Sequence, residues 1–203
     1  MSIENLVSKF DFFQGIMDVQ TTIVNDIELI HEISTKERIC SNMLHRDAYE
    51  KTLVEVKKSA VANDAGEGVY ALRNIPRETV VAFYNGIRIP ADEEDINDSW
   101  DDCSYRIFVD IDDGTDIDNE NTERMDIPPK YRNTNAYCAT VAHKINHSFN
   151  PNCKFSKFIH PIFGPIPCVV TSEDVYAGDE LFTYYKYLLS DCPDWYSTLW
   201  DVQ

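Results

Sequence analysis

Short apolar stretches, each bounded by a turn sequence, run through the chain from residue 54 onward. Residues 54–57 alternate between apolar and polar side chains, and residues 69–72 and 80–84 are mainly apolar, so each stretch predicts a β-strand. Two turn sequences separate them: residues 63–68 contain two glycines available for positive φ, and residues 75–78 contain a proline. Many short strands joined by frequent turns predict a mainly β domain.

The dipeptide Asn85-Gly86 separates the stretch 80–84 from another apolar stretch at residues 87–89. Asn-Gly between two such stretches is typical of a tight hairpin, so a chain reversal is predicted there. Residues 1–45 follow neither the helical nor the strand period. We therefore expect an N-terminal extension over residues 1–45 and one domain over residues 46–203.

The composition is that of a globular protein, with 43% hydrophobic residues. No apolar stretch is long enough to cross a membrane, and the N-terminus lacks the basic and apolar regions of a signal peptide. We expect a monomer with no membrane partner, in the nucleus, the cytoplasm or both. Without a secretory signal, the cysteines are expected to be reduced thiols rather than disulfides; they lie at positions 40, 103, 138, 153, 168 and 192.

The charge is strongly acidic: 35 Asp and Glu residues against 18 Lys and Arg residues give a formal net charge of −17. This balance argues against direct binding to nucleic acid, whose phosphates need a basic surface. It favours a basic partner such as a lysine-rich peptide, or it serves solubility alone. The acidic stretch 110–123 contains Gly114, but its register does not fit a calcium-binding loop, so a solvated acidic loop is predicted.

The most specific pattern in the chain consists of two segments: Asn146-His147-Ser148-Phe149-Asn150-Pro151-Asn152-Cys153 and Gly178-Asp179-Glu180-Leu181-Phe182-Thr183-Tyr184-Tyr185. Together they resemble the two segments that form the active site of SET-domain protein-lysine methyltransferases. From about residue 40 onward the chain is similar to the branch of that family that carries MORN repeats ahead of the SET domain, and the repeats are missing from this sequence. Further matching segments are 65–68, 83–86, 137–139, 143–145, 160–161, 163–166, Tyr187 and 194–196.

The resemblance implies a mainly β SET domain, with β-clip-like short sheets and a C-terminal pseudoknot in which the last segment is threaded under a loop. It implies a transferase that moves a methyl group from S-adenosyl-L-methionine to lysine side chains of a basic protein. The substrate would be a histone, as for a histone-lysine N-methyltransferase of chromatin, or a non-histone protein. The resemblance also implies residue roles. The cofactor would be bound by Gly66, Glu67, Gly68, Asn146, His147 and Trp195. The lysine would be held by Tyr84, Tyr185 and Tyr187, with Tyr185 as the catalytic hydroxyl, and Phe155 would line the same channel.

These residue types suit the chemistry. Methyl transfer to an amine is an in-line displacement that requires the two reactants to be aligned. The lysine must be neutral, although its ordinary pKa is about 10.4, and an apolar channel lowers that pKa by desolvation. Tyrosine rings accept cationic groups on their faces, and their hydroxyls orient the amine. Whether the Tyr185 hydroxyl acts as a general base or only positions the amine stays open in the sequence.

Two substitutions depart from the family pattern. Phe155 stands where the branch has a tyrosine, and Lys186 stands where it has a glycine. No zinc cluster is expected, since only Cys192 follows the second segment, so no metal is predicted. The alternative function is an inactive SET-domain module that binds basic peptides. A metal-binding scaffold built on His143 and His147 is a third hypothesis, against which structural histidines are the simpler interpretation.

Overall fold

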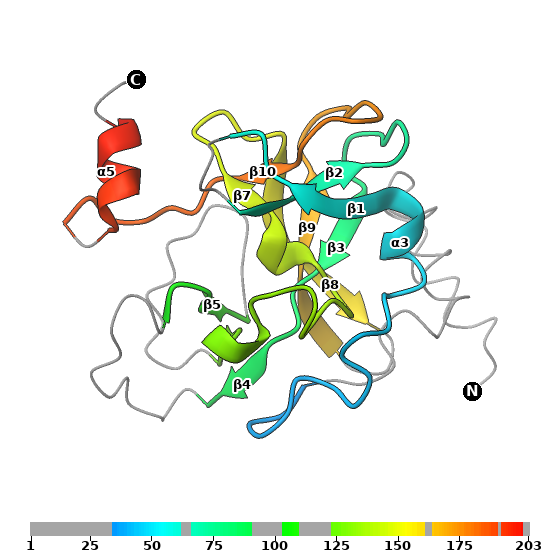
Figure 1. Cartoon of the computed structure of the whole chain (residues 1–203), viewed down its shortest axis with the longest axis vertical. Coiled ribbons are helices and arrows are strands. Elements are labelled where there is room, and N and C mark those ends of the chain that lie inside the picture. The colour runs from blue at the N-terminus through cyan, green and yellow to red at the C-terminus, as the bar shows by residue number, and fades with distance from the viewer. Residues whose placement is uncertain are drawn as a thin grey trace.

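The computed structural model describes residues 34–61, 66–90, 103–109, 123–160, 164–190 and 192–200. Within these ranges the strands form four small sheets and the helices are short (Figure 1), which confirms the predicted mainly β class. In chain order the elements are α3 (Glu50–Leu53), β1 (Val54–Lys58), β2 (Glu67–Ala71), β3 (Val80–Phe83), β4 (Ile87–Ile89), β5 (Ile107–Phe108), β6 (Arg124–Asp126), η1 (Pro129–Tyr131), η2 (Ala142–Lys144), β7 (Asn146–His147), β8 (Cys153–His160), β9 (Gly164–Thr171), β10 (Phe182–Thr183) and α5 (Asp194–Trp200).

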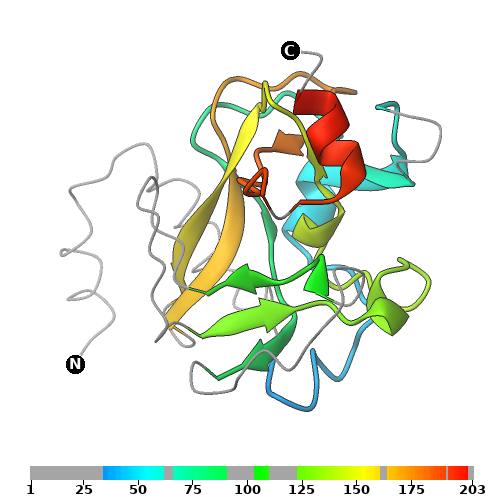
Figure 2. The same cartoon turned by 90° about the vertical axis from the view of Figure 1, so that its left-hand side faces the viewer.

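A three-stranded antiparallel sheet in the order β3-β9-β8 forms the centre of the core. Strands β8 and β9 pair along their whole lengths and lie side by side as two long, curved strands (Figure 2). Strand β9 is flanked on both edges, and its residues 166–170 are all buried, as expected for an inner strand with a continuous apolar sequence. Phe83 of β3 contacts Phe158 of β8 edge to face, with 5.6 Å between the ring centroids.

Strands β1 and β2 confirm the two strands predicted at 54–57 and 69–72. They pair antiparallel, from Val54 opposite Ala71 to Lys58 opposite Glu67. The other edge of β2 meets the C-terminal part of the chain, because the Leu181 N–H donates to the Val69 carbonyl at 2.8 Å. The β1–β2 pair therefore places residues 66–68 beside the second motif segment, residues 178–185.

The two motif segments meet in a short parallel pair, β10 against β7, in which Phe182 lies opposite Asn146. Asn152 holds the backbone of the second segment in place at residues 180–182. Its side-chain amide donates to the Glu180 carbonyl at 2.9 Å, and its side-chain oxygen accepts from the Phe182 N–H at 2.8 Å. One asparagine thus satisfies both backbone groups, as a neighbouring strand would.

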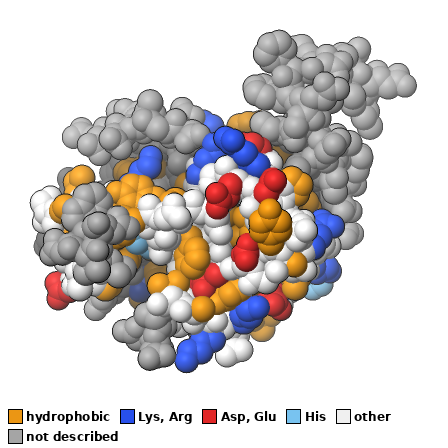
Figure 3. Space-filling model, turned by 90° about the horizontal axis from the view of Figure 1, so that it is seen from above, with side chains coloured by type: hydrophobic (Ala, Val, Ile, Leu, Met, Phe, Trp, Pro, Cys, Tyr) orange, Lys and Arg blue, Asp and Glu red, His pale blue; other side chains and the backbone are white. Residues whose placement is uncertain are grey.

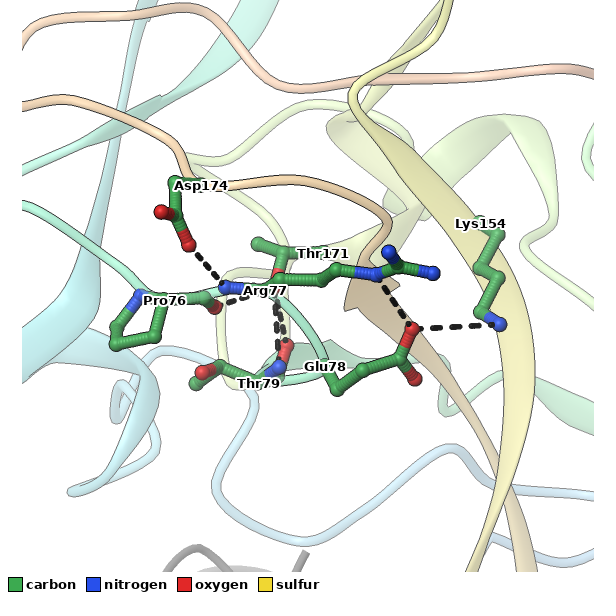
Figure 4. A network of polar contacts seen from close by, with 7 residues as sticks. All are labelled: Pro76, Arg77, Glu78, Thr79, Lys154, Thr171 and Asp174. Atoms are coloured by element: carbon green, nitrogen blue, oxygen red, sulfur yellow. Dashed lines mark hydrogen bonds and ion pairs between the residues drawn. The ribbon is translucent and has the colours of Figure 1, made fainter. Parts of the chain in front are cut away.

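The predicted turn at 75–78 is confirmed, and buried polar contacts hold it (Figure 4). The Thr171 hydroxyl donates to the Pro76 carbonyl at 2.7 Å and accepts from the Thr79 N–H at 3.0 Å. Glu78 has a φ of 62°, which is rare outside glycine, and its carboxylate lies 3.8 Å from the Lys154 ammonium. This turn joins the central sheet to β2.

The hairpin predicted at Asn85-Gly86 is wrong. Strand β3 pairs with β9 and strand β4 pairs with β6, so the dipeptide carries the chain from one sheet to another. Gly86 does not have the positive φ that a tight hairpin turn requires. The glycine serves close approach instead: a Cβ on Gly86 would lie 2.4 Å from the Asp126 carbonyl oxygen. Asn85 is held by the Tyr137 hydroxyl, which donates to its carbonyl at 2.8 Å.

Some predictions fall on residues outside the described ranges, namely most of the N-terminal extension, the turn residues 63–65 and nearly all of the acidic stretch 110–123. The boundary at residue 45 stays a prediction; of the segment before it, Ile39 lies in the core, 1% exposed. All six cysteines are free thiols, as predicted. Among the described residues no helix is both long and apolar enough to span a membrane.

Candidate functional site

The backbone at Gly66 and Gly68 is shaped for close approach. Gly66 has a φ of 70°, and a Cβ there would meet no atom within 4 Å, so this turn leaves open space beside it. Gly68 lies in β2, and a Cβ there would lie 2.1 Å from the Glu180 Oε1 atom and 3.2 Å from the Asn146 Nδ2 atom. The second glycine is therefore required by packing and not by its φ.

Asn146 lies beside these glycines in β7. Its Nδ2 donates to the Glu67 carbonyl at 3.1 Å and to the Glu180 Oε1 at 3.2 Å. Glu180 is 8% exposed and also accepts hydrogen bonds from Ser59, Ala60 and Tyr70. Burial raises the pKa of Glu180, but these four donors outweigh it and hold the pKa below its ordinary value. The carboxylate is therefore ionised at neutral pH.

The Glu67 side chain turns into the protein. Its carboxylate pairs with the buried ammonium of Lys144 at 2.8 Å and accepts from the Thr134 hydroxyl. Burial raises the pKa of Glu67, and the hydrogen bonds from Lys144 and Thr134 outweigh it, so the pKa lies below its ordinary value. Its backbone carbonyl, bound to Asn146, is the group that Glu67 presents along this edge.

Aromatic rings surround His147. Its ring centroid lies 4.5 Å from Phe149, 4.8 Å from Tyr196, 5.3 Å from Tyr185 and 6.0 Å from Trp195. The His147 Nδ1 accepts from the Tyr185 N–H at 3.1 Å, which places the imidazole proton on Nε2. Burial lowers the pKa of His147 to about 4, against a smaller raising by a backbone hydrogen bond at Thr183, so the ring is neutral at pH 7.

Tyr185 and Tyr187 lie together at the rim of this cluster. Their ring centroids are 5.4 Å apart, and Trp195 of α5 packs against both, at 6.4 Å from Tyr185 and 6.2 Å from Tyr187. Helix α5 lies outside the sheets, at one side of the molecule (Figure 1). The Tyr185 hydroxyl donates to the Ile145 carbonyl at 2.8 Å. Burial, and then the neighbouring phenols, raise the pKa of both tyrosines above the ordinary value.

Tyr84 directly follows β3, and its ring lies edge to face with His143, with 6.5 Å between the ring centroids. It is 3% exposed, and its hydroxyl donates to the Tyr105 carbonyl. Burial raises the pKa of Tyr84 well above its ordinary value, with smaller contributions from Asp126 and from the phenol of Tyr185. All three predicted tyrosines thus keep their protons at neutral pH. Such an arrangement offers aromatic faces and neutral hydroxyls to a cationic or amine group.

Phe155 lies apart from this group in the contacts observed. It lies in β8 opposite Val169 and packs, partly buried, against the core. The ring contacts described for the tyrosines do not include it. The structure therefore brings Asn146 beside residues 66–68, and it groups His147 with Tyr185, Tyr187 and Trp195. The assignment of Phe155 to the substrate channel stays a prediction.

Three residues near the site carried no assigned role in the sequence. Tyr105 supplies the acceptor for Tyr84, and it stands in a stretch whose pattern gives no periodic signal. Tyr196 is fully buried and packs against His147, whereas the family resemblance assigns a cofactor role only to its neighbour Trp195. Glu180 belongs to the second motif, but only the packing of its carboxylate over Gly68 shows what it contacts.

His143 is a core residue in η2. It is 6% exposed, and its ring stacks on Tyr137 with 5.2 Å between centroids. No group of three His, Cys, Asp or Glu side chains placed to hold a metal is found in the part of the chain that the structure describes. The absence of a resident metal stays a prediction, and the packing of His143 gives it a structural role.

We expect acid to destabilise the protein partly through His143. Burial, and then the charge of Lys144, lower the pKa of His143 from 6.5 to about 3 in the folded state. The unfolded chain then binds the proton first, so this stability is present above pH 6.5 and is lost as the pH falls toward 3. Between pH 7 and pH 5 the wild type should lose about 2 kcal/mol more unfolding free energy than His143→Gln. Urea titrations at both pH values measure this difference, and equal losses would contradict it.

Lys186 has a φ of 56°, in the region that favours glycine. The side chain is exposed, so the cost is in the backbone, about 1–2 kcal/mol for a residue with a Cβ. Lys186→Gly should stabilise the protein by about 0.5–1 kcal/mol, since the entropy of glycine offsets part of the gain. Lys186→Ala keeps the strained backbone and should give no gain. Thermal unfolding of the three proteins compares them, and equal effects of Gly and Ala would reject the strain.

Comparison with known proteins identifies a matching family and a similar protein. The SET-domain family model matches residues 66–186. The histone-lysine N-methyltransferase SETD7 of Halocynthia roretzi is 39% identical to this chain over an alignment of 175 residues. The alignment covers 82% of this chain and 42% of that protein. This chain therefore spans less than half the length of that relative.

Two solved structures are also similar to part of this chain. The crystal structure of KRYPTONITE in complex with mCHH DNA, H3(1-15) peptide and SAH matches with a TM-score of 0.45 and 21% identity, over 70% of this chain and 25% of that chain. The structure of ctPRC2 in an autoinhibited conformation bound to S-adenosylmethionine matches with a TM-score of 0.46 and 18% identity, over 74% of this chain and 17% of that chain.

Proposed function

This chain belongs to the SET-domain family, and from that premise we propose that it is a protein-lysine methyltransferase that uses S-adenosyl-L-methionine. The observation that carries the proposal is the packing of Tyr185 and Tyr187 on each other, with ring centroids 5.4 Å apart, beside the cluster around His147. Burial raises the pKa of Tyr84, which lies close enough for the phenols of both to raise it further. The curated relative, at 39% identity, is named a histone-lysine N-methyltransferase, which supports the same reaction.

The cofactor would lie along the edge formed by the residues 66–68, Asn146, His147 and Trp195. Two features of the chain suit it. The backbone at Gly66 has open space where a side chain would stand, and the Nε2 of His147 is buried without a hydrogen-bond partner in the described part of the chain. When bound, the cofactor supplies an electrophilic methyl group on a sulfonium. Trp195, which is 45% exposed, would cover the adenine by stacking.

The lysine would enter between Tyr84, Tyr185 and Tyr187. Their rings exclude water from the amine, which lowers the lysine pKa and favours the neutral nucleophile. The proton leaves to solvent before transfer, because the phenols are themselves protonated and cannot accept it. Alignment of the amine with the methyl group is then the main contribution of these residues, and alignment can supply several kcal/mol of the barrier.

Tyr185 would position the amine and would not act as a general base. Its raised pKa keeps the hydroxyl protonated at neutral pH, and that proton is already donated to the Ile145 carbonyl at 2.8 Å. The lone pairs on its oxygen remain available to accept a hydrogen bond from the lysine amine. One N–H of the amine is thereby held away from the sulfonium, and the nitrogen lone pair is directed toward it.

A basic protein is the proposed substrate, either a histone tail or a non-histone protein, in the nucleus or the cytoplasm. The net charge of −17 favours such a partner as a whole. On the described part of the face shown in Figure 3, acidic, basic and hydrophobic side chains alternate. We therefore propose that the electrostatic field of the whole acidic protein attracts the basic substrate, and not a uniform acidic patch on that face.

The proposed function is tested by incubating the protein with radiolabelled S-adenosylmethionine, core histones and a cell extract. We expect label on protein lysines, released with the lysine fraction after hydrolysis. A folded protein that binds the cofactor but labels no protein would contradict the enzyme and leave the alternative, a SET module that binds basic peptides. That alternative is favoured by one observation, the strained Lys186 between two site tyrosines.

Phe155 leads to a prediction on product multiplicity. The family branch has a tyrosine at this position, and phenylalanine lacks the hydroxyl that could hold a water near the amine. We expect the wild type to add more than one methyl group to at least some lysines and Phe155→Tyr to shift the product toward monomethyl-lysine. Mass spectrometry of a methylated peptide measures the distribution. Strict monomethylation by the wild type, unchanged in the variant, would reject the role.

A further inference from the structure

The Glu180 carboxylate binds four groups from three parts of the chain around the proposed cofactor edge. Its Oε1 accepts from the Ser59 hydroxyl at 2.6 Å and from Asn146 Nδ2 at 3.2 Å. Its Oε2 accepts from the Ala60 N–H at 3.0 Å and from the Tyr70 hydroxyl at 2.7 Å. A carboxylate that accepts four hydrogen bonds and packs over Gly68 is held in one position.

This carboxylate determines which way the Asn146 amide faces. Both partners of Nδ2, the Glu67 carbonyl and the ionised Glu180, can only accept hydrogen bonds. The amide cannot turn over without placing its own oxygen against two acceptors. Its Oδ1 therefore points away from Glu180, and it receives no hydrogen bond from any residue that the structure describes.

We propose that Glu180 is a positioning residue for the cofactor: it fixes Asn146 so that the amide oxygen is presented to an N–H donor of the bound molecule. The inference rests on the proposed function, which supplies that molecule. Glu180 itself touches no cofactor and acts through Asn146. The amide oxygen then selects a ligand with a donor at this point, such as an ammonium or an amino group.

Glu180→Gln tests the orientation with little change of shape. The backbone N–H of Ala60 cannot rotate, so the new glutamine must place its oxygen there and its NH₂ group opposite Asn146. Two donors would then face each other, and turning the Asn146 amide over would instead set its Oδ1 against the Glu67 carbonyl, so neither orientation keeps both hydrogen bonds. Oδ1 is then no longer held at the cofactor edge, and in the turned-over form the NH₂ group replaces it there. We expect S-adenosylmethionine binding to weaken by about tenfold or more, as for the loss of one hydrogen bond to a charged group.

A double-mutant cycle separates positioning from general loosening of the fold. Calorimetric titrations with S-adenosylmethionine compare Glu180→Gln in the wild-type background and in the Asn146→Ala background. We expect about a tenfold loss in the first and less than a twofold loss in the second, because Asn146 is the route of the effect. Asp179→Asn, an acid-to-amide change at an exposed neighbour, controls for lost charge and should change the affinity less than twofold.

Each possible outcome either supports or overturns the positioning role of Glu180. Equal losses in the two backgrounds, or no loss in the first, would overturn the positioning role of Glu180 while the proposed function stands. A folded wild type that binds no S-adenosylmethionine would overturn the proposed function, and the positioning role with it. Thermal unfolding is measured for every variant to show that it folds. If Glu180→Gln fails to fold, Glu180→Asp replaces it, because the shorter side chain keeps the charge but moves it away from Asn146. Glu180→Asp is then titrated in the same two backgrounds, with the same expected results.

Discussion

Gly86→Ala is expected to unfold the protein or to lower its unfolding free energy by about 3 kcal/mol or more. The added Cβ would lie 2.4 Å from the Asp126 carbonyl oxygen and 2.8 Å from its carbonyl carbon. These are backbone atoms of β6, which pairs on both sides with β4 and β5, so they cannot move aside as a side chain could. The clash would separate two segments that both belong to the core.

The same substitution at Gly178 is the matched control. Gly178 has a φ of 94°, and a Cβ there would meet no atom within 4 Å, so the cost is backbone strain of about 1–2 kcal/mol. Chemical denaturation of the three proteins gives the free energies. If Gly86→Ala stays within about 1 kcal/mol of the wild type, then close packing is not the reason for this glycine.

Tyr185→Phe is expected to reduce methyl transfer by about a hundredfold or more, while the affinity for S-adenosylmethionine changes little. The substitution removes one hydroxyl, together with its hydrogen bond to the Ile145 carbonyl, and keeps the ring that packs on His147 and Trp195. If this hydroxyl orients the amine, its loss affects the rate of transfer and not the binding of the cofactor.

Tyr176→Phe is a matched control for the Tyr185 experiment, because it removes a hydroxyl from a side chain that is 63% exposed in a loop. It should leave the rate within about twofold of the wild type. Single-turnover rates and calorimetric titrations are measured on the same preparations. A Tyr185→Phe protein that transfers methyl groups at the wild-type rate would remove the tyrosine from the mechanism.

Much of the fold could be predicted from local sequence. The strands at residues 54–57, 69–72 and 80–84 and the turn at 75–78 follow from apolar pattern and turn residues, which act over a few positions. The Asn85-Gly86 dipeptide shows the limit. Its local signal is a hairpin, but β9 and β6 are the better partners for the two strands beside it, and long-range pairing overrides the turn preference.

The candidate site was predictable as a set of residues but not as an arrangement. The two motifs indicated Asn146, His147 and Tyr185 through a family resemblance, whereas their meeting depends on the parallel pairing of β10 with β7, which no local pattern encodes. Tyr105 contributes a backbone carbonyl, and any residue type supplies that group. The role proposed for Glu180 depends on where four donors converge, which is a property of the folded chain alone.

We propose above that this protein transfers methyl groups to lysine at the tyrosines beside His147. The most direct measurement incubates wild type and Tyr185→Phe with S-adenosylmethionine carrying a deuterated methyl group, together with core histones and a cell extract, and locates the label by tandem mass spectrometry. We expect deuterated methyl groups on lysine Nζ atoms with the wild type and almost none with the variant. Label on other residue types, equal label from both proteins, or none from a wild type that binds the cofactor would contradict it.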